Sequence, residues 1–195
     1  MHHLRAEFSI ALACLVFAVT ARGEDIDARN AAQTPLSVER FDCENAFDLI
    51  AMMVIARCSV YQAPATASAA LAAAATRLRA AGLASEEEFA ASHIAFCPLA
   101  TGSGMVPAPG QLYLDDGLIG LSTDGLAEIL AHELAHVRQF EQLGRRGFKC
   151  EYVRDMLACG GCQNRDHRLE AEAYARQDQV RERLIEITSE HGAAD

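Results

Sequence analysis

The spacing of apolar residues predicts that the first part of the domain is helical. Phe41–Val60 has apolar residues at intervals of three and four, which is the spacing of one helical face. Ala65–Ala81 is rich in alanine, the best helix former, and Gly82 stands where a helix stop is expected. Ser85–Glu88 has the form of a capping box, so a third helix is expected to run from there to about Ala95.

The pattern changes in Cys97–Gly110. This segment is rich in glycine and proline, and we expect no regular structure there. Two short apolar runs follow, Gln111–Leu114 and Leu118–Leu121, and they flank the turn-forming residues Asp115–Gly117. Such an arrangement is typical of a small β-hairpin with a tight turn.

Helical spacing returns after the hairpin. A helix is expected over Gly125–Leu143 with Gly144 as its stop, and a short helix is expected around Phe148–Leu157. A long terminal helix should cover Arg165–Ile187. The predicted fold class is therefore α+β, mainly α, in a single domain over residues 41–190.

Residues 1–21 have the features of a cleaved signal peptide. Arg5 precedes the uncharged apolar run Phe8–Val19, and small residues at Val19–Ala21 occupy the positions that a signal peptidase reads. The apolar run is too short to span a bilayer, so we expect no stable membrane insertion after cleavage. Residues 22–40 are polar and without period, which predicts a flexible lead-in to the domain.

The cysteines also predict export. The chain has seven, and removal of the signal peptide removes Cys14 and leaves an even set. An even set predicts three disulfides in an oxidising compartment, either periplasmic or secreted, although the sequence does not choose the pairing. Cys159 and Cys162 also have the spacing of a redox pair or of half a zinc knuckle. Neither a βαβ unit nor a second matching pair accompanies them, so structural disulfides are favoured.

Charge argues against two classes of partner. The formal net charge is −10, with a pI near 5.1, whereas binding to nucleic acid phosphates requires a basic surface. The same acidity argues against docking on an anionic membrane. We therefore expect neither nucleic acid nor a membrane surface as the main partner.

The sequence HELAH, at residues 132–136, carries the clearest chemical signal. Side chains four residues apart lie about 40° apart around a helix, so His132 and His136 present their imidazoles side by side, as two zinc ligands must. Glu133 lies at the edge of that face, where its carboxylate can take a proton from a water that zinc activates. The alternative is a core helix with hydrogen-bonded histidines, but it leaves a glutamate among uncharged neighbours unexplained.

A hydrolytic zinc site needs a third protein ligand and keeps one position for water. Glu170 and Glu172 lie on the terminal helix, about equally far from its apolar stripe and on opposite sides, so periodicity does not choose between them. The downstream candidates are His167, Glu170, Glu172 and His191.

Gly125–Tyr174 resembles the core of the gluzincin metallopeptidases. HELAHVRQF followed by RLEAEAY is similar to small bacterial zincin-like domains, in which HExxH on one helix meets a glutamate from a later helix. In several of these families the third ligand opens an E-x-x-A pattern, and the resemblance implies that Glu170, three residues before Ala173, is that ligand. Tyr174 departs from the family, which usually has an acidic or amide residue after the alanine.

The resemblance implies an exported zinc metallopeptidase with a minimal zincin-like fold, in which the active-site helix, the hairpin and the C-terminal helix form the site. Zn²⁺ would bind His132, His136 and Glu170, and Glu133 would be the catalytic base. The substrate would be a peptide or protein. Its extended chain would pair with a hairpin strand, at Leu112–Leu114 or at Leu118–Gly120. The alternative is a hairpin that only packs against the helix.

Other interpretations stay open at this stage. One is a zinc-binding domain without catalysis, and another is a metal-free, disulfide-bonded helical module that binds a partner. If the protein is an enzyme, the group that stabilises the developing oxyanion is not assigned. The candidates are Tyr152, His167 and Tyr174.

Overall fold

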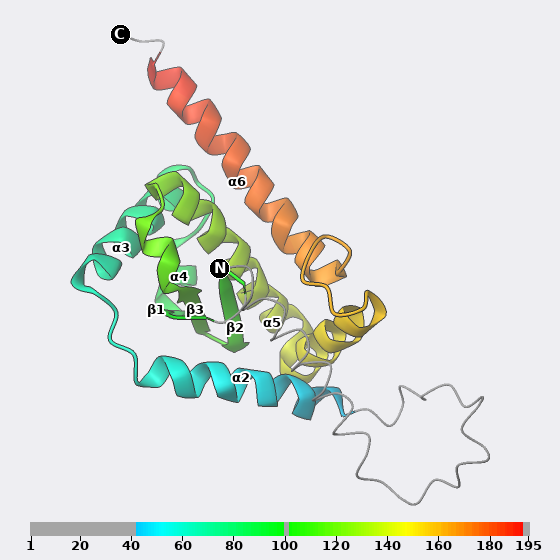
Figure 1. Cartoon of the computed structure of the whole chain (residues 1–195). Coiled ribbons are helices and arrows are strands. Elements are labelled where there is room, and N and C mark those ends of the chain that lie inside the picture. Colours follow the sequence, from blue (N-terminus) through cyan, green and yellow to red (C-terminus); the bar gives the residue numbers. More distant parts are fainter. Residues whose placement is uncertain (1–41, 100–101, 193–195) are drawn as a thin grey trace, which may run out of the picture.

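The computed structural model describes residues 42–99 and 102–192 (Figure 1). The expected signal peptide (1–21) and lead-in (22–40) lie outside this part. The described part is mainly helical with one small sheet, which confirms the predicted fold class of α+β, mainly α. Its elements are α2 (Cys43–Ser59), α3 (Ala65–Ala80), α4 (Glu86–Ala90), β1 (His93–Cys97), β2 (Gly104–Ala108), β3 (Gln111–Asp115), the 3-10 helix η2 (Asp116–Gly120), α5 (Thr123–Ala158) and α6 (Arg168–Gly192).

The sheet has three strands in the order β1-β3-β2. β3 is central, parallel to β1 and antiparallel to β2. Leu112 and Leu114 of β3 are fully buried in the main core, whereas Tyr113 points to the other face, into a smaller cluster with Cys58 and Cys97. β3 is therefore covered on both faces, and β1 and β2 are the edges of the sheet.

α5 is the long helix on which the rest of the domain is built. Leu126, Leu130 and Leu134 recur at intervals of four and are all buried, so one stripe of α5 packs into the core. The helix contacts α2, α3, α6 and the sheet (Figure 1). Gly144 has a left-handed backbone (φ 68°) inside α5, so the segment is two helices that meet at the predicted stop.

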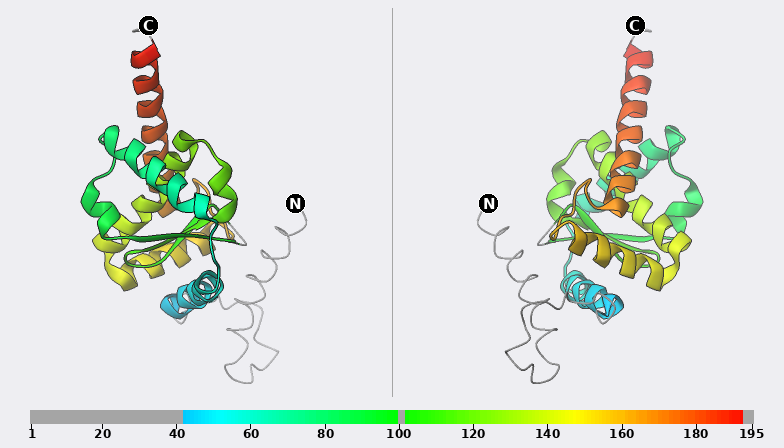
Figure 2. Two further views of the ribbon diagram at one scale, coloured as in Figure 1. Left: turned by 90° about the vertical axis from the view of Figure 1, so that its left-hand side faces the viewer. Right: turned by 90° about the vertical axis from the view of Figure 1, so that its right-hand side faces the viewer.

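α6 packs along α5, and its C-terminal end extends past the other elements in both views of Figure 2. The buried residues of α6 follow helical spacing at Leu169, Ala173, Val180 and Leu184. Within the described residues, no helix is long and apolar enough to cross a membrane.

Three predictions around the sheet are wrong. The helix that begins after Ser85 ends at Ala90, because the next residues pair with β3 as strand β1 instead of continuing to Ala95. The segment rich in glycine and proline contains strand β2, which accommodates Pro107 because the pairing is irregular between Met105 and Ala108.

The predicted hairpin is the third error. Gln111–Asp115 is a strand, but its antiparallel partner is β2, which precedes it in the chain. The second apolar run forms η2, because the Asp115 side chain accepts a hydrogen bond from the Gly117 amide and turns the chain into a 3-10 helix.

All six cysteines of the described residues form disulfides: Cys43–Cys150, Cys58–Cys97 and Cys159–Cys162. The first two attach α2 to α5 and to β1, respectively. Cys159 and Cys162 pair with each other, so they are not half of a zinc knuckle. Three disulfides indicate an oxidising, exported environment.

Candidate metal site

The first half of α5 presents the two histidines and the glutamate of the HELAH motif to the interior. The helix begins where the Ser122 side chain accepts a hydrogen bond from the Gly125 amide. His132, Glu133 and His136 are only 6%, 3% and 5% exposed. Because the two histidines lie one turn apart, their rings are neighbours, with centroids separated by 5.0 Å.

α6 adds Glu170 to this pair. Its Oε2 lies 3.2 Å from His132 Nε2, and its Oε1 lies 3.6 Å from His136 Nε2. One ligand atom from each of the three side chains lies within 4.8 Å of the others, and all three residues are buried. A buried group of two imidazoles and one carboxylate at this separation can hold a metal ion.

The other candidate ligands do not join this group. Glu172 is exposed, and its carboxylate contacts Gln139 and Arg168. His167 is buried, but each of its ring nitrogens faces a backbone atom. The side chain of His191 lies outside the described part of the chain.

Gln139 orients His136 and joins the two helices. Its Nε2 donates to the Leu169 carbonyl at 3.0 Å and to Glu172 Oε2 at 2.9 Å. Its Oε1, 2.8 Å from His136 Nδ1, must then accept. His136 therefore carries a proton on Nδ1, which leaves Nε2, the nitrogen that faces Glu170, as the atom that would bind a metal ion after losing its own proton.

Gln139 was not among the predicted site residues. A signal for it was present, because a side chain three residues after a ligand on the same helix can reach that ligand. Tyr174, where the gluzincins have an acidic or amide residue, packs its ring against His132 with centroids 4.6 Å apart. Tyr174 therefore makes a ring contact with His132, and the polar contact to a histidine of the site is made by Gln139 of α5 to His136.

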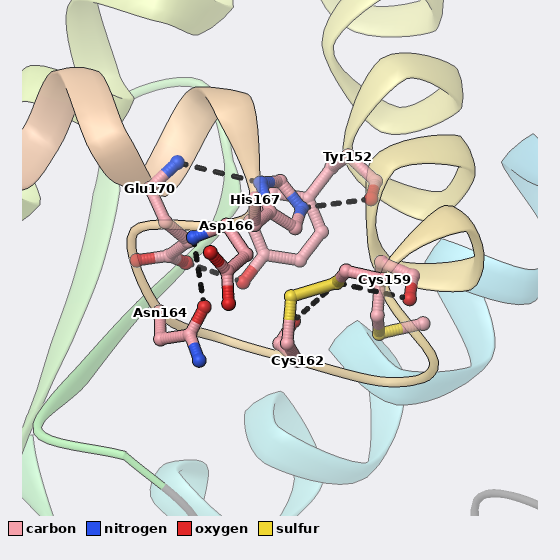
Figure 3. The surroundings of a disulfide bond; sticks show 8 residues. Tyr152, Cys159, Cys162, Asn164, Asp166, His167 and Glu170 are labelled. Atoms are coloured by element: carbon pink, nitrogen blue, oxygen red, sulfur yellow. Dashed lines mark hydrogen bonds between the residues drawn. A yellow bond between two sulfur atoms is a disulfide. The ribbon is translucent and has the colours of Figure 1, made fainter.

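Tyr152 holds the third ligand. Its hydroxyl donates to Glu170 Oε1 at 2.6 Å (Figure 3). Burial and the charge of Glu170 raise the pKa of Tyr152 well above its ordinary value, so the hydroxyl stays protonated. Burial by itself raises the pKa of Glu170. Hydrogen bonds with His132, His136 and Tyr152 lower it by more, so the net pKa is below the ordinary value and the carboxyl stays ionised.

Glu133 differs from Glu170 in its surroundings. Burial raises the pKa of Glu133 above its ordinary value, although the nearby histidines act in the opposite direction. Among the described residues, its Oε2 is buried without a hydrogen-bond partner, as is His132 Nδ1. A buried carboxylate with an unpaired oxygen, next to three side chains that could bind a metal ion, is consistent with a site for a metal ion and a water molecule.

The strand that lies on Glu133 is β2. A Cβ atom added to Gly104 would overlap the Glu133 side chain, so β2 passes directly over the carboxylate. The prediction that the substrate pairs with one of two hairpin strands is therefore wrong for both segments. Leu112–Leu114 belongs to the central strand and has no free edge, and Leu118–Gly120 lies in the 3-10 helix. Gly104 was missed because nothing in a glycine-rich segment marks the one glycine that touches a site.

Comparison of the chain with protein-family models, with curated proteins and with solved structures finds no significant match.

Proposed function

We propose that the protein is an exported zinc metallopeptidase of gluzincin type that hydrolyses peptide bonds in peptides or proteins. The observation that carries the proposal is the meeting of His132, His136 and Glu170 beside a buried Glu133 carboxylate with an unpaired oxygen. A purely structural metal site does not need that extra carboxylate.

Zinc is the metal that this donor set favours. Two histidines and one glutamate are the ligands of known hydrolytic zinc sites, in which three protein ligands leave a position for water. When bound there, zinc would polarise the substrate carbonyl and lower the pKa of a water molecule. Gln139 holds a proton on His136 Nδ1, so Nε2 is the nitrogen that would bind zinc, and Tyr152 donates a hydrogen bond to Glu170 Oε1.

Glu133 is the general base in this proposal. Its Oε2 accepts the proton of the attacking water and then delivers it to the nitrogen of the leaving amine. Burial raises the pKa of Glu133, so this pKa lies closer to that of the water that Glu133 would deprotonate. The geometry of one helix turn keeps Glu133 beside both histidines.

Tyr174 is our assignment for the group that donates to the developing oxyanion. His167 is committed through both nitrogens, and the Tyr152 hydroxyl is committed to Glu170. The Tyr174 ring lies against His132 and is only partly buried, and Arg165 lies over the same ring. The substrate would lie on β2, the edge strand that passes over Glu133, and would add a strand to the sheet.

The test uses Glu133→Gln with Glu141→Gln as a control, because Glu141 is an exposed glutamate on the same helix. Zinc content is measured by elemental analysis, and hydrolysis is measured with a quenched-fluorescent peptide library. We expect wild type and Glu141→Gln to contain zinc and to be active until a chelator is added. Glu133→Gln should keep zinc and lose hydrolysis.

The other outcomes identify the alternative functions. Zinc without hydrolysis in wild type would favour a non-catalytic zinc-binding domain. No zinc in wild type would favour a metal-free interaction module. Loss of zinc from Glu133→Gln would show that Glu133 is a ligand and not the base.

A further inference from the structure

His167 is fully buried at the start of α6, with an exposed fraction of 0%. Its Nε2 lies 2.9 Å from the Tyr152 carbonyl oxygen, and its Nδ1 lies 3.3 Å from the Glu170 backbone nitrogen (Figure 3). A carbonyl can only accept and an amide N–H can only donate, so the imidazole donates from Nε2 and accepts at Nδ1. A buried histidine with both nitrogens engaged in this way has no free atom for a metal or a substrate.

Its position explains one of the two hydrogen bonds. α6 begins at Arg168, so Glu170 is the third helical residue, whose N–H has no partner within the helix. His167 precedes the helix and supplies that partner, a role usually filled by the shorter serine, threonine, aspartate or asparagine. The imidazole is longer, and its far nitrogen also reaches Tyr152 on α5.

Both of its partners belong to the metal site. Three residues form a closed ring of hydrogen bonds: the Glu170 amide donates to His167, His167 donates to the Tyr152 carbonyl, and the Tyr152 hydroxyl donates to Glu170 Oε1. The ring spans the two helices, and the rings of Tyr152 and His167 also pack together with centroids 4.4 Å apart.

The chain between the helices fixes only part of their register, because the Cys159–Cys162 disulfide constrains its first residues but not those that follow. The segment 159–167 has left-handed glycines at Gly160 and Gly161, and residues 163–166 are exposed. The position of Glu170 relative to His132 and His136 therefore depends on contacts that cross between α5 and α6.

We propose that His167 is a positioning residue that, through this ring, holds Glu170 against the two histidines and thereby sets the metal affinity of the site. The inference rests on the proposed zinc site but not on catalysis. A histidine is needed because no common capping residue can bind the Glu170 amide and the Tyr152 carbonyl at once.

The test is a double-mutant cycle on metal affinity. His167→Asn keeps an acceptor for the Glu170 amide but is too short to reach Tyr152, and Tyr152→Phe removes the hydroxyl without touching the cap. Zn²⁺ affinity is measured by competition with a chromophoric chelator, and Co²⁺ is added separately as a probe whose visible spectrum reports coordination geometry. Asp166→Asn, exposed in the same loop, is the matched control.

Each single variant should lose about 10- to 100-fold in Zn²⁺ affinity, as outer-layer partners of metal ligands typically do. The double variant should lose much less than the product of the two, because residues of one ring act together. The Co²⁺ spectrum should change in both variants and stay unchanged in Asp166→Asn. A purely structural role for His167 would lower the melting temperature of the chelated protein without altering that spectrum.

Other outcomes overturn the proposal. If His167→Asn fails to fold, Tyr152→Phe still tests the ring from the other helix. Affinities within twofold of wild type for the folded variants, or losses that simply multiply, would show that the ring does not act on the metal. If wild type itself binds no Zn²⁺, the proposed function fails together with this inference, whereas tight binding without hydrolysis leaves the inference intact.

Discussion

The metal site joins two regions that are organised in different ways. On α5, one turn of helix places His132, Glu133 and His136, and no other element is needed to set their spacing. At the junction of α5 and α6, Glu170 comes from 38 residues beyond His132. Its place depends on side chains that reach from one helix to the other.

This difference predicts which substitutions would disturb the metal-binding geometry. The spacing of His132 and His136 should tolerate changes in their surroundings as long as the helix forms. The junction should respond to changes at Gln139, Tyr152 or the loop between the helices, because these contacts decide how α6 lies on α5. The predictions below test this contrast.

The largest effect is expected from Glu170→Ala. The site would drop to two protein ligands, so Zn²⁺ affinity should fall by more than about 100-fold, beyond the loss typical of an outer-layer partner. Glu172→Ala is the matched control, and its unfolding free energy should stay within about half a kcal/mol of wild type. Zinc stoichiometry and melting temperature, with and without chelator, give the comparison. The reverse ranking would move the third ligand to Glu172.

The disulfides separate stability from site geometry. Removal of Cys43–Cys150, which closes a long loop with a sequence separation of 107, should lower the unfolding free energy by about 4–5 kcal/mol. Removal of Cys159–Cys162, with a separation of only 3, should lower it by about 2 kcal/mol.

The loss of zinc affinity should instead be larger when Cys159–Cys162 is removed than when Cys43–Cys150 is removed. The reason is that Cys159–Cys162 lies in the loop that leads to His167 and Glu170 (Figure 3). Paired serine substitutions, followed by urea unfolding and zinc titration, would measure both. If the junction pair changed neither quantity, the loop would have no part in placing Glu170.

Gly104→Ala tests the contact between β2 and the base. The added methyl group would overlap Glu133 and displace its carboxylate. Hydrolysis should fall by about 100-fold, the effect of a displacement near 1 Å, while zinc content stays the same. Gly120→Ala is the control, since nothing lies within 4 Å of a Cβ there. Full activity in Gly104→Ala would remove β2 from the active site.

Gln139→Leu tests the orientation of His136. The substitution removes the partner of His136 Nδ1 and the bond to the Leu169 carbonyl, so Zn²⁺ affinity should fall by about 10- to 100-fold. Gln142→Leu, at an exposed position on α5, should leave the affinity unchanged. Equal affinities in the two variants would mean that the helix alone orients His136.

The smallest effect is a dependence on pH. In the metal-free protein, burial lowers the pKa of His136, but the carboxylates of Glu170 and Glu133 raise it by more, so the net pKa lies above the ordinary value of a histidine. The imidazole must lose this proton to bind metal, so Zn²⁺ affinity should fall by about tenfold per pH unit below that pKa. Chelator competition between pH 6 and 8 measures the slope, and a flat profile would contradict the protonated state.

Much of the helical framework could be predicted from the sequence. The start of α3 and the break at Gly144 depend on residues next to them in the chain. The strands could not be predicted in the same way. β1 forms because its residues pair with β3, and β2 forms in spite of Pro107 because it lies at an edge of the sheet.

The sequence by itself determined what helix geometry controls: the two histidines on one face of α5, with Glu133 beside them. It also determined an even set of six cysteines after residue 41. Only the tertiary structure decided the disulfide pairing, the contact of Gly104 with Glu133, and which glutamate of α6 meets the histidines. The periodicity of α6 reveals its buried stripe but not which flank faces α5. That choice depends on contacts between residues far apart in the chain, which no local pattern encodes.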